Sequence, residues 1–144
     1  MSRLLRDILS QRIMLLDGAM GTMIQRFGLA EADFRGEEFA SHEVSLAGNN
    51  DLLSLTRADV LSAIHREYLE AGSDIITTCT FNAQAISQAE YKMQSEVCAM
   101  NRAAVALARK EADRMTALTP DKPRFVAGSV GPTGKTASMS PDVD

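Results

Sequence analysis

The sequence predicts an α/β fold with about three parallel strands covered by helices, and two observations lead to that prediction. First, an apolar, strand-like stretch runs three times into a loop of small, polar or glycine residues: 13–16 into 17–22, 75–76 into 77–82, and 125–127 into 128–134. Second, a long segment with helical spacing separates the last two stretches, so these strands are expected to run parallel. Parallel strands bring their carboxyl ends to one edge of a sheet, where the three loops are expected to meet.

The covering helices follow from capping residues and from the spacing of apolar residues. They are expected at residues 2–9, 56–71, 82–91 and 95–118. Thr56 and Asp59 resemble a capping pair for the second of these helices, and Asn82 is expected to cap the third. Residues 28–51 show no sustained period and are expected to form a long functional loop or a solvated flap at the loop edge.

Composition and charge exclude several classes of protein. With 144 residues, of which 45% are hydrophobic, the chain is long enough for one soluble domain with its own core. A net charge of −4 and scattered basic residues offer no footprint for nucleic acid. No apolar run approaches the roughly 18 residues of a membrane helix, and two cysteines make no disulfide framework. A cytoplasmic protein that binds neither nucleic acid nor membranes is expected.

The number of expected strands indicates an unfinished sheet. Three parallel strands leave an open edge, whereas closed barrels of this type need eight strands and about 250 residues. The segment after Gly134 shows no helical or strand period. Residues 1–144 are therefore expected to be the first part of a larger module.

The first loop, Asp17-Gly18-Ala19-Met20-Gly21-Thr22, suits an amino-acid ligand. A carboxylate at a strand end can accept a hydrogen bond from an ammonium, and amides exposed by glycine can donate to a carboxylate. The candidate substrate-binding residues are therefore Asp17, Gly18, Ala19, Met20, Gly21 and Thr22, with Thr78 and Asn82 of the second loop. Alternatively, Asp17 caps the turn and the glycines only supply permissive φ angles.

Two other kinds of site are weighed, a phosphate loop and a zinc site. Residues 128–136 end in Gly-Lys-Thr, but five residues separate Gly128 from Gly134 where a phosphate loop needs four. Pro132 also removes an amide donor. The possible zinc ligands are His42, His65, Cys79 and Cys98. None of these are paired at ligand spacing, so no metal ligand and no catalytic residue is assigned.

Four blocks of the sequence carry a family resemblance. They are Leu15-Leu16-Asp17-Gly18-Ala19-Met20-Gly21-Thr22-Met23-Ile24-Gln25, Asp33-Phe34-Arg35-Gly36-Glu37, Gly48-Asn49-Asn50-Asp51-Leu52-Leu53 and Gly131-Pro132-Thr133. Together they resemble the homocysteine-binding barrel of cobalamin-dependent methionine synthases, within the homocysteine S-methyltransferase family. The two middle blocks are more specific than the first, which simpler homocysteine methyltransferases share, so the resemblance points to the cobalamin-dependent enzymes.

This resemblance implies a (β/α)₈ TIM barrel, of which residues 1–144 form the N-terminal part. It implies a methyltransferase that moves a methyl group from methylcobalamin to zinc-bound homocysteine, giving methionine, with 5-methyltetrahydrofolate and cobalamin modules later in the same chain. The implied zinc ligands are three cysteines on later strands, whose motifs do not occur here. This segment is therefore expected to hold homocysteine but neither zinc nor cobalamin, and to be inactive alone.

One position departs from the family pattern. The family commonly shows Thr-Asn-Thr-Phe at the second strand, where this chain has Thr78-Cys79-Thr80-Phe81. The change removes two hydrogen-bond donors and one acceptor at residue 79. Two interpretations stay open beside the enzyme: a non-catalytic barrel fragment or interaction module, and a phosphate-binding β/α enzyme suggested by Gly134-Lys135-Thr136.

Overall fold

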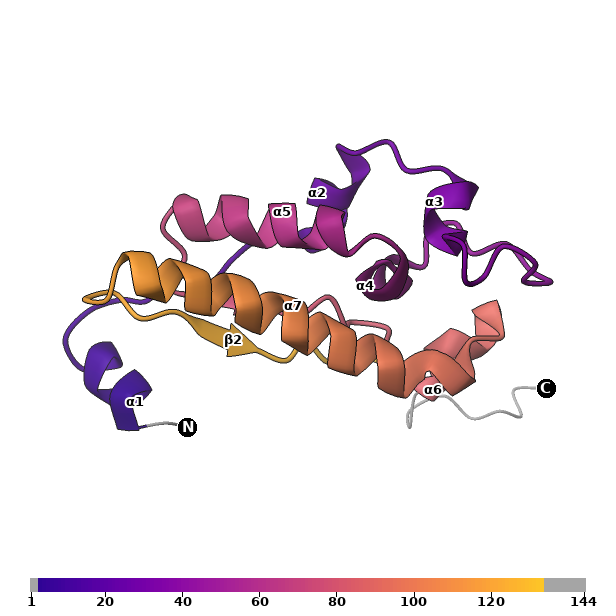
Figure 1. Cartoon of the computed structure of the whole chain (residues 1–144). Helices are drawn as coiled ribbons and strands as arrows, with labels where there is room; N and C mark the ends of the chain where they lie inside the picture. The colour runs from indigo at the N-terminus through magenta and orange to yellow at the C-terminus, as the bar shows by residue number, and fades with distance from the viewer. Residues whose placement is uncertain (1–2, 134–144) are drawn as a thin grey trace, which may run out of the picture.

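The computed structural model describes residues 3–133, which form helices packed on a small parallel sheet (Figure 1). The α-helices are α1 (Arg3–Leu9), α2 (Met20–Gln25), α3 (Glu31–Arg35), α4 (Leu53–Thr56), α5 (Ala58–Glu70), α6 (Ala85–Gln88) and α7 (Val97–Leu118). The strands are β1 (Ile75–Thr77) and β2 (Phe125–Ala127), and the 3₁₀ turns are η1 (Asn50–Leu52), η2 (Ala89–Tyr91) and η3 (Gln94–Glu96). In Figure 1, α5 and α7 run side by side along the molecule, with β2 next to α7.

Helices α5 and α7 form the layer that covers the sheet. The apolar residues that α5 buries recur at helical spacing: Val60, Leu61, Ile64 and Leu69. Leu69 packs with Ala108 and Ala112 of α7 against Ile76 of β1. The alanines carry small side chains, so α7 lies close to the strand. The helices expected at 56–71 and 95–118 are confirmed, although α5 begins at Ala58 and α7 begins at Val97 after the short turn η3. The expected capping pair is wrong, because Thr56 ends α4 and α5 begins without a side-chain cap.

The long loop expected at residues 28–51 is part of the core. It contains α3, and it buries Phe34, at 6% exposed, and Leu46, which is fully buried. Both side chains belong to the same apolar cluster as Leu61 and Ile64 of α5. The interpretation of this segment as a solvated flap is therefore wrong. Its apolar side chains are buried in the core although their spacing in the sequence is irregular.

The sheet is smaller than the sequence predicts. β1 and β2 pair in parallel, with Ile76 opposite Val126. The strand expected at residues 13–16 is reduced to one parallel bridge between Leu16 and Ile75, so the described residues hold a two-stranded sheet. Ile13 and Leu16 are 86% and 58% exposed, so these apolar side chains do not belong to the buried core. The parallel direction of the strands is confirmed.

The amino end of the sheet is fastened at Asp74, whose side chain is 1% exposed. Arg12 donates to its carboxylate from both Nη atoms, at 2.9 and 2.7 Å, and the Leu15 amide donates at 2.9 Å. Lys122 Nζ lies 3.7 Å from the same carboxylate. Hydrogen bonding to Arg12 is the largest of the effects that lower the pKa of Asp74 to about 2.

Candidate functional site

The loops beyond the carboxyl ends of the strands enclose a cavity of about 330 Å³. Gly18 and Gly21 come from the first loop, Thr78 and Asn82 from the loop after β1, and Ser129 from the loop after β2. The three loops therefore meet at one edge, as expected of parallel strands.

Asp17 lies at the border of this cavity rather than in its lining. Its carboxylate accepts hydrogen bonds from the Thr77 amide at 2.8 Å and from Thr77 Oγ1 at 3.1 and 3.2 Å. Burial raises the pKa of Asp17, and the hydrogen bonds from Thr77 oppose that shift. Asp17 thus links the first loop to the end of β1, which is a different contact from the turn cap considered above.

The glycines of the first loop make room for the cavity. Gly18, Met20 and Gly21 line it, whereas Ala19 and Thr22 do not. Neither Gly18 nor Gly21 has a positive φ, so the alternative that they serve a left-handed backbone is wrong. A Cβ at Gly18 would lie 3.0 Å from the Tyr68 hydroxyl, and a Cβ at Gly21 would lie 3.7 Å from Asn50 Nδ2. Tyr68 therefore fills the space beside Gly18, whereas the missing side chain at Gly21 leaves room beside Asn50, which also lines the cavity.

Thr78 fastens the two neighbouring loops to each other. Its hydroxyl accepts a hydrogen bond from the Ser129 amide at 3.0 Å and lies 2.7 Å from Thr80 Oγ1. Thr80 donates its own hydroxyl hydrogen to the Ser129 carbonyl at 2.8 Å, so Thr78 must donate to Thr80. Thr78 lines the cavity, but its hydroxyl hydrogen is already donated to Thr80.

Asn82 is not the helix cap that the sequence predicts. α6 begins three residues later, and the Gln84 side chain accepts the capping hydrogen bond from the Ile86 amide at 2.8 Å. Gln84 reaches the free backbone amide of Ile86 with its longer side chain. Glutamine is not among the residues that usually cap helices, so the sequence did not indicate this cap. Asn82 instead lines the cavity, and its backbone amide donates to the Asp51 carboxylate.

Asp51 is a cavity residue that the sequence argument did not select. Its side chain is 3% exposed, and both carboxylate oxygens lie 3.3 Å from the Asn82 amide nitrogen. Burial raises the pKa of Asp51 to about 6. The signal that could have found it is the polar run Asn49-Asn50-Asp51 placed directly before the apolar Leu52-Leu53.

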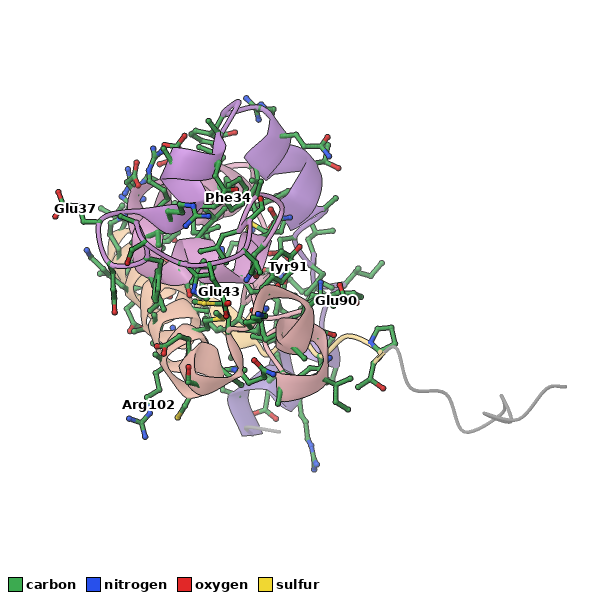
Figure 2. The ribbon with its side chains drawn as sticks, turned by 90° about the vertical axis from the view of Figure 1, so that its right-hand side faces the viewer. Phe34, Glu37, Glu43, Glu90, Tyr91 and Arg102 are labelled. Carbon is green, nitrogen blue, oxygen red and sulfur yellow. The ribbon has the colours of Figure 1, made fainter. Side chains whose placement is uncertain are left out.

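A second, polar hollow of about 340 Å³ adjoins the first and shares Asp51 and Asn82 with it. Tyr91 of η2 and Asn49 also line it. Figure 2 looks onto this end of the molecule, where Glu43 of the long loop and Tyr91 of η2 are labelled. The buried Asn49 amide pairs with Gln88 of α6 through hydrogen bonds of 2.8 and 3.0 Å. Residues 48–51 therefore form a wall between the two hollows: Asn50 lines the first hollow, Gly48 and Asn49 line the second, and Asp51 lines both.

The four possible zinc ligands do not converge. Cys79 is buried in the cavity wall, which raises its pKa to about 12, and Cys98 is exposed on α7. His65 is buried on α5, where desolvation lowers its pKa to about 4, and His42 Nε2 lies 2.8 Å from the Tyr91 carbonyl oxygen. Within residues 3–133, no three His, Cys, Asp or Glu side chains lie close enough to hold a metal ion.

Two remaining expectations concern phosphate and membranes. Gly134 and Lys135 of the phosphate-loop-like segment lie outside the described residues. Gly131, in the described part, is packed against Phe81: its amide donates to the Phe81 carbonyl at 3.0 Å. None of the helices in residues 3–133 is both long and apolar enough to cross a membrane.

Comparison with known proteins agrees with this architecture. The family model for homocysteine S-methyltransferases matches residues 14–144. The metallated form of the homocysteine methyltransferase MmuM from Escherichia coli is 27% identical, with a TM-score of 0.69 over 90% of this chain and 42% of that one. Its oxidized form is also 27% identical, with a TM-score of 0.70 over 91% of this chain and 41% of the other. The described sheet and helices thus match a fragment of the homocysteine methyltransferase fold, and the chain belongs to the homocysteine S-methyltransferase family.

Proposed function

We propose that this chain supplies the amino-acid-binding part of a homocysteine S-methyltransferase that produces methionine. The observation that carries the proposal is the cavity at the carboxyl ends of the strands, lined by Gly18, Gly21 and Thr77, whose amide donates to the Asp17 carboxylate. The chain spans about 42% of the length of the E. coli relative, so the activity proposed is that of a larger protein.

In this proposal the two charged ends of homocysteine bind to the first loop. Asp17 accepts a hydrogen bond from the ammonium, and the amides of Gly18, Met20 and Gly21 donate to the substrate carboxylate. Thr78 and Asn82 contact the substrate from the loop after β1. Asp17 can accept a hydrogen bond from the ammonium because its hydrogen bonds with Thr77 do not use all the lone pairs of the carboxylate.

We further propose that residues 1–144 form the N-terminal part of a (β/α)₈ barrel in a cytoplasmic, cobalamin-dependent methionine synthase. The Asp33-Phe34-Arg35-Gly36 and Gly48-Asn49-Asn50-Asp51 blocks support this choice over simpler homocysteine methyltransferases. The methyl donor would then be methylcobalamin, regenerated from 5-methyltetrahydrofolate bound by later modules.

Zinc does not fit the side chains described here. No cluster of three ligating groups lies within residues 3–133, and the Cys79 thiol has its pKa raised to about 12, which opposes the thiolate form that zinc binds. No step assigned to this chain therefore passes through zinc. Its residues bind and orient the amino-acid end of the substrate.

Replacing Asp17 by Asn tests the substrate assignment. Asn keeps an acceptor for the Thr77 amide but removes the charge, so calorimetry should show about tenfold weaker binding of L-homocysteine, the loss of one charge-assisted hydrogen bond. Asp113→Asn removes a carboxylate of an exposed pair on α7 and serves as the control. Normal affinity in Asp17→Asn, together with a lowered melting temperature, would make Asp17 a structural link only.

A further inference from the structure

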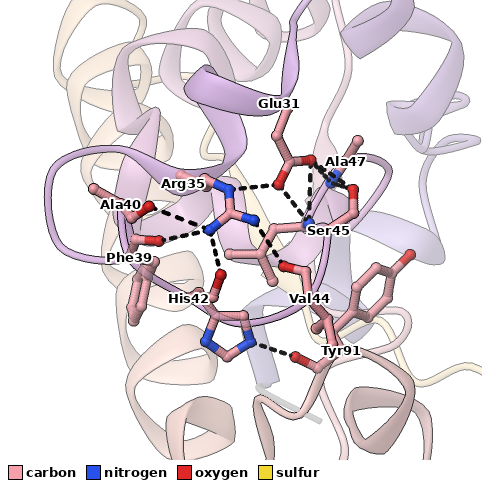
Figure 3. A network of polar contacts seen from close by, with 10 residues as sticks. Glu31, Arg35, Phe39, Ala40, His42, Val44, Ser45, Ala47 and Tyr91 are labelled. Atoms are coloured by element: carbon pink, nitrogen blue, oxygen red, sulfur yellow. Dashed lines mark hydrogen bonds and ion pairs between the residues drawn. The ribbon is translucent and has the colours of Figure 1, made fainter.

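The segment from residue 36 to residue 47 is held by the side chains of one short helix. Arg35 of α3 donates from Nη1 to the His42 carbonyl at 2.6 Å and from Nη2 to the Val44 carbonyl at 2.9 Å (Figure 3). Nη1 also lies 3.3 Å from the carbonyl oxygens of Phe39 and Ala40. For the carbonyl groups of His42 and Val44, the guanidinium thus takes the place of the backbone donors that a helix or strand would provide.

Glu31, one turn earlier on α3, does the same for the amides that follow. Its carboxylate accepts from the Leu46 amide at 2.9 Å, from the Ala47 amide at 2.7 Å and from Ser45 Oγ at 2.7 Å (Figure 3). Arg35 Nε donates to the same carboxylate at 2.6 Å. The hydrogen bond from Leu46 is the largest of the effects that lower the pKa of Glu31 to about 2, so the carboxylate is ionised at neutral pH.

The chain fixed by Glu31 leads straight into the wall between the two hollows. Residues 48–51 follow Ala47 directly, and their polar side chains line the hollows. The Asn50 carbonyl oxygen lies 3.5 Å from Cys79 Sγ, so this wall also covers the buried thiol. At the far side the wall is tied to α6 by the Asn49–Gln88 pair.

We propose that Glu31 and Arg35 are positioning residues that hold the wall formed by residues 48–51 closed over the cavity and over Cys79. The identity of the cavity's ligand rests on the proposed function, but the position of the wall does not. Opening of the wall exposes the thiol of Cys79, whose reaction rate therefore reports this role without homocysteine.

The experiment uses Cys98→Ser, which leaves Cys79 as the chain's sole thiol, and follows its reaction with a disulfide reagent such as DTNB. Glu31→Gln should raise the rate at least about tenfold, because a neutral amide presents one acceptor oxygen where the carboxylate presents two. Arg35→Lys keeps the positive charge but loses the planar guanidinium that donates in several directions, and it should give a smaller increase in the labelling rate. Glu67→Gln breaks the exposed Arg26–Glu67 pair, whose residues line neither hollow, and should change nothing.

Urea separates a local opening from general destabilisation. If the pair positions the wall, the faster labelling changes little at low urea, because local opening exposes little surface. Unchanged labelling in both variants would overturn the proposal. So would labelling that rises with urea as steeply as global unfolding does, since the pair would then stabilise the whole fold. If Glu31→Gln does not fold, Arg35→Lys gives the same two readouts. Absence of homocysteine binding would count against the proposed function and leave this result standing.

Discussion

At the amino end of the sheet, Asp74 contacts the cations Arg12 and Lys122, whereas at the carboxyl end the buried Asp51 is hydrogen-bonded by backbone amides and no cation within residues 3–133 lowers its pKa. Hydrogen bonds from Arg12 lower the pKa of Asp74 to about 2, whereas burial raises the pKa of Asp51 to about 6. At the amino end, the charge of Asp74 is fully paired, and these contacts join residues 12–15 to the sheet. The carboxyl end leaves a carboxylate poorly paired beside a cavity, as functional sites commonly do.

The largest loss of stability is expected from Asp74→Asn, which removes the charge at the amino end. We expect a loss of about 2–3 kcal/mol in the free energy of unfolding, less than for a fully buried pair because Arg12 is 40% exposed. Because the folded pKa is depressed, the wild-type advantage should be present above pH 4 and fade as the pH falls towards 2. Urea denaturation at several pH values measures it, and a loss below 0.5 kcal/mol, as for the exposed Asp113→Asn, would break the comparison.

Gly131→Ala should disturb the carboxyl end almost as strongly. A Cβ at Gly131 would lie 2.4 Å from the Phe81 carbonyl oxygen, which cannot move without displacing the loop after β1. We expect a loss of about 1–3 kcal/mol in thermal or urea unfolding. Gly128→Ala is the matched control, because a Cβ there meets no atom within 4 Å. Equal stability of the two variants would show that the loops tolerate independent movement.

Asp51→Asn should change stability in the opposite direction to Asp74→Asn. The folded pKa of Asp51 is raised, so ionisation costs folding free energy as the pH rises from about 4 to 6 and above. The variant should therefore gain up to about 3 kcal/mol relative to wild type between pH 4 and pH 7. Cys79 and Tyr91, the titratable groups that Asp51 influences, both have raised pKa values and stay neutral in this range. A stability difference between variant and wild type that does not change with pH would show that the pKa of Asp51 is not raised by folding.

The sequence predicts the carboxyl-edge site only in part, and particular residues show why. Parallel strands bring the first loop together with Thr78 and Asn82, and periodicity suffices for that conclusion. Asp51 and the Glu31–Arg35 pair come from residues 28–51, whose sequence shows no sustained period. There, side chains of the short helix α3 hold residues 42–47, and such contacts leave no periodic pattern in the sequence. The strand expected at residues 13–16 is a single bridge because an apolar run reveals strand propensity but not the presence of neighbours on both sides.

The measurement that tests the difference between the two ends most directly is a titration of the ¹⁵N-labelled chain with L-homocysteine, followed by amide NMR spectra. If the carboxyl end binds the substrate's amino-acid group, the amide signals of Gly18, Gly21 and Asn82 shift with a common saturation curve, and those of Leu15 and Asp74 stay in place. Shifts at the amino end, or unmoved signals of Gly18 and Gly21 at millimolar homocysteine, would contradict the account.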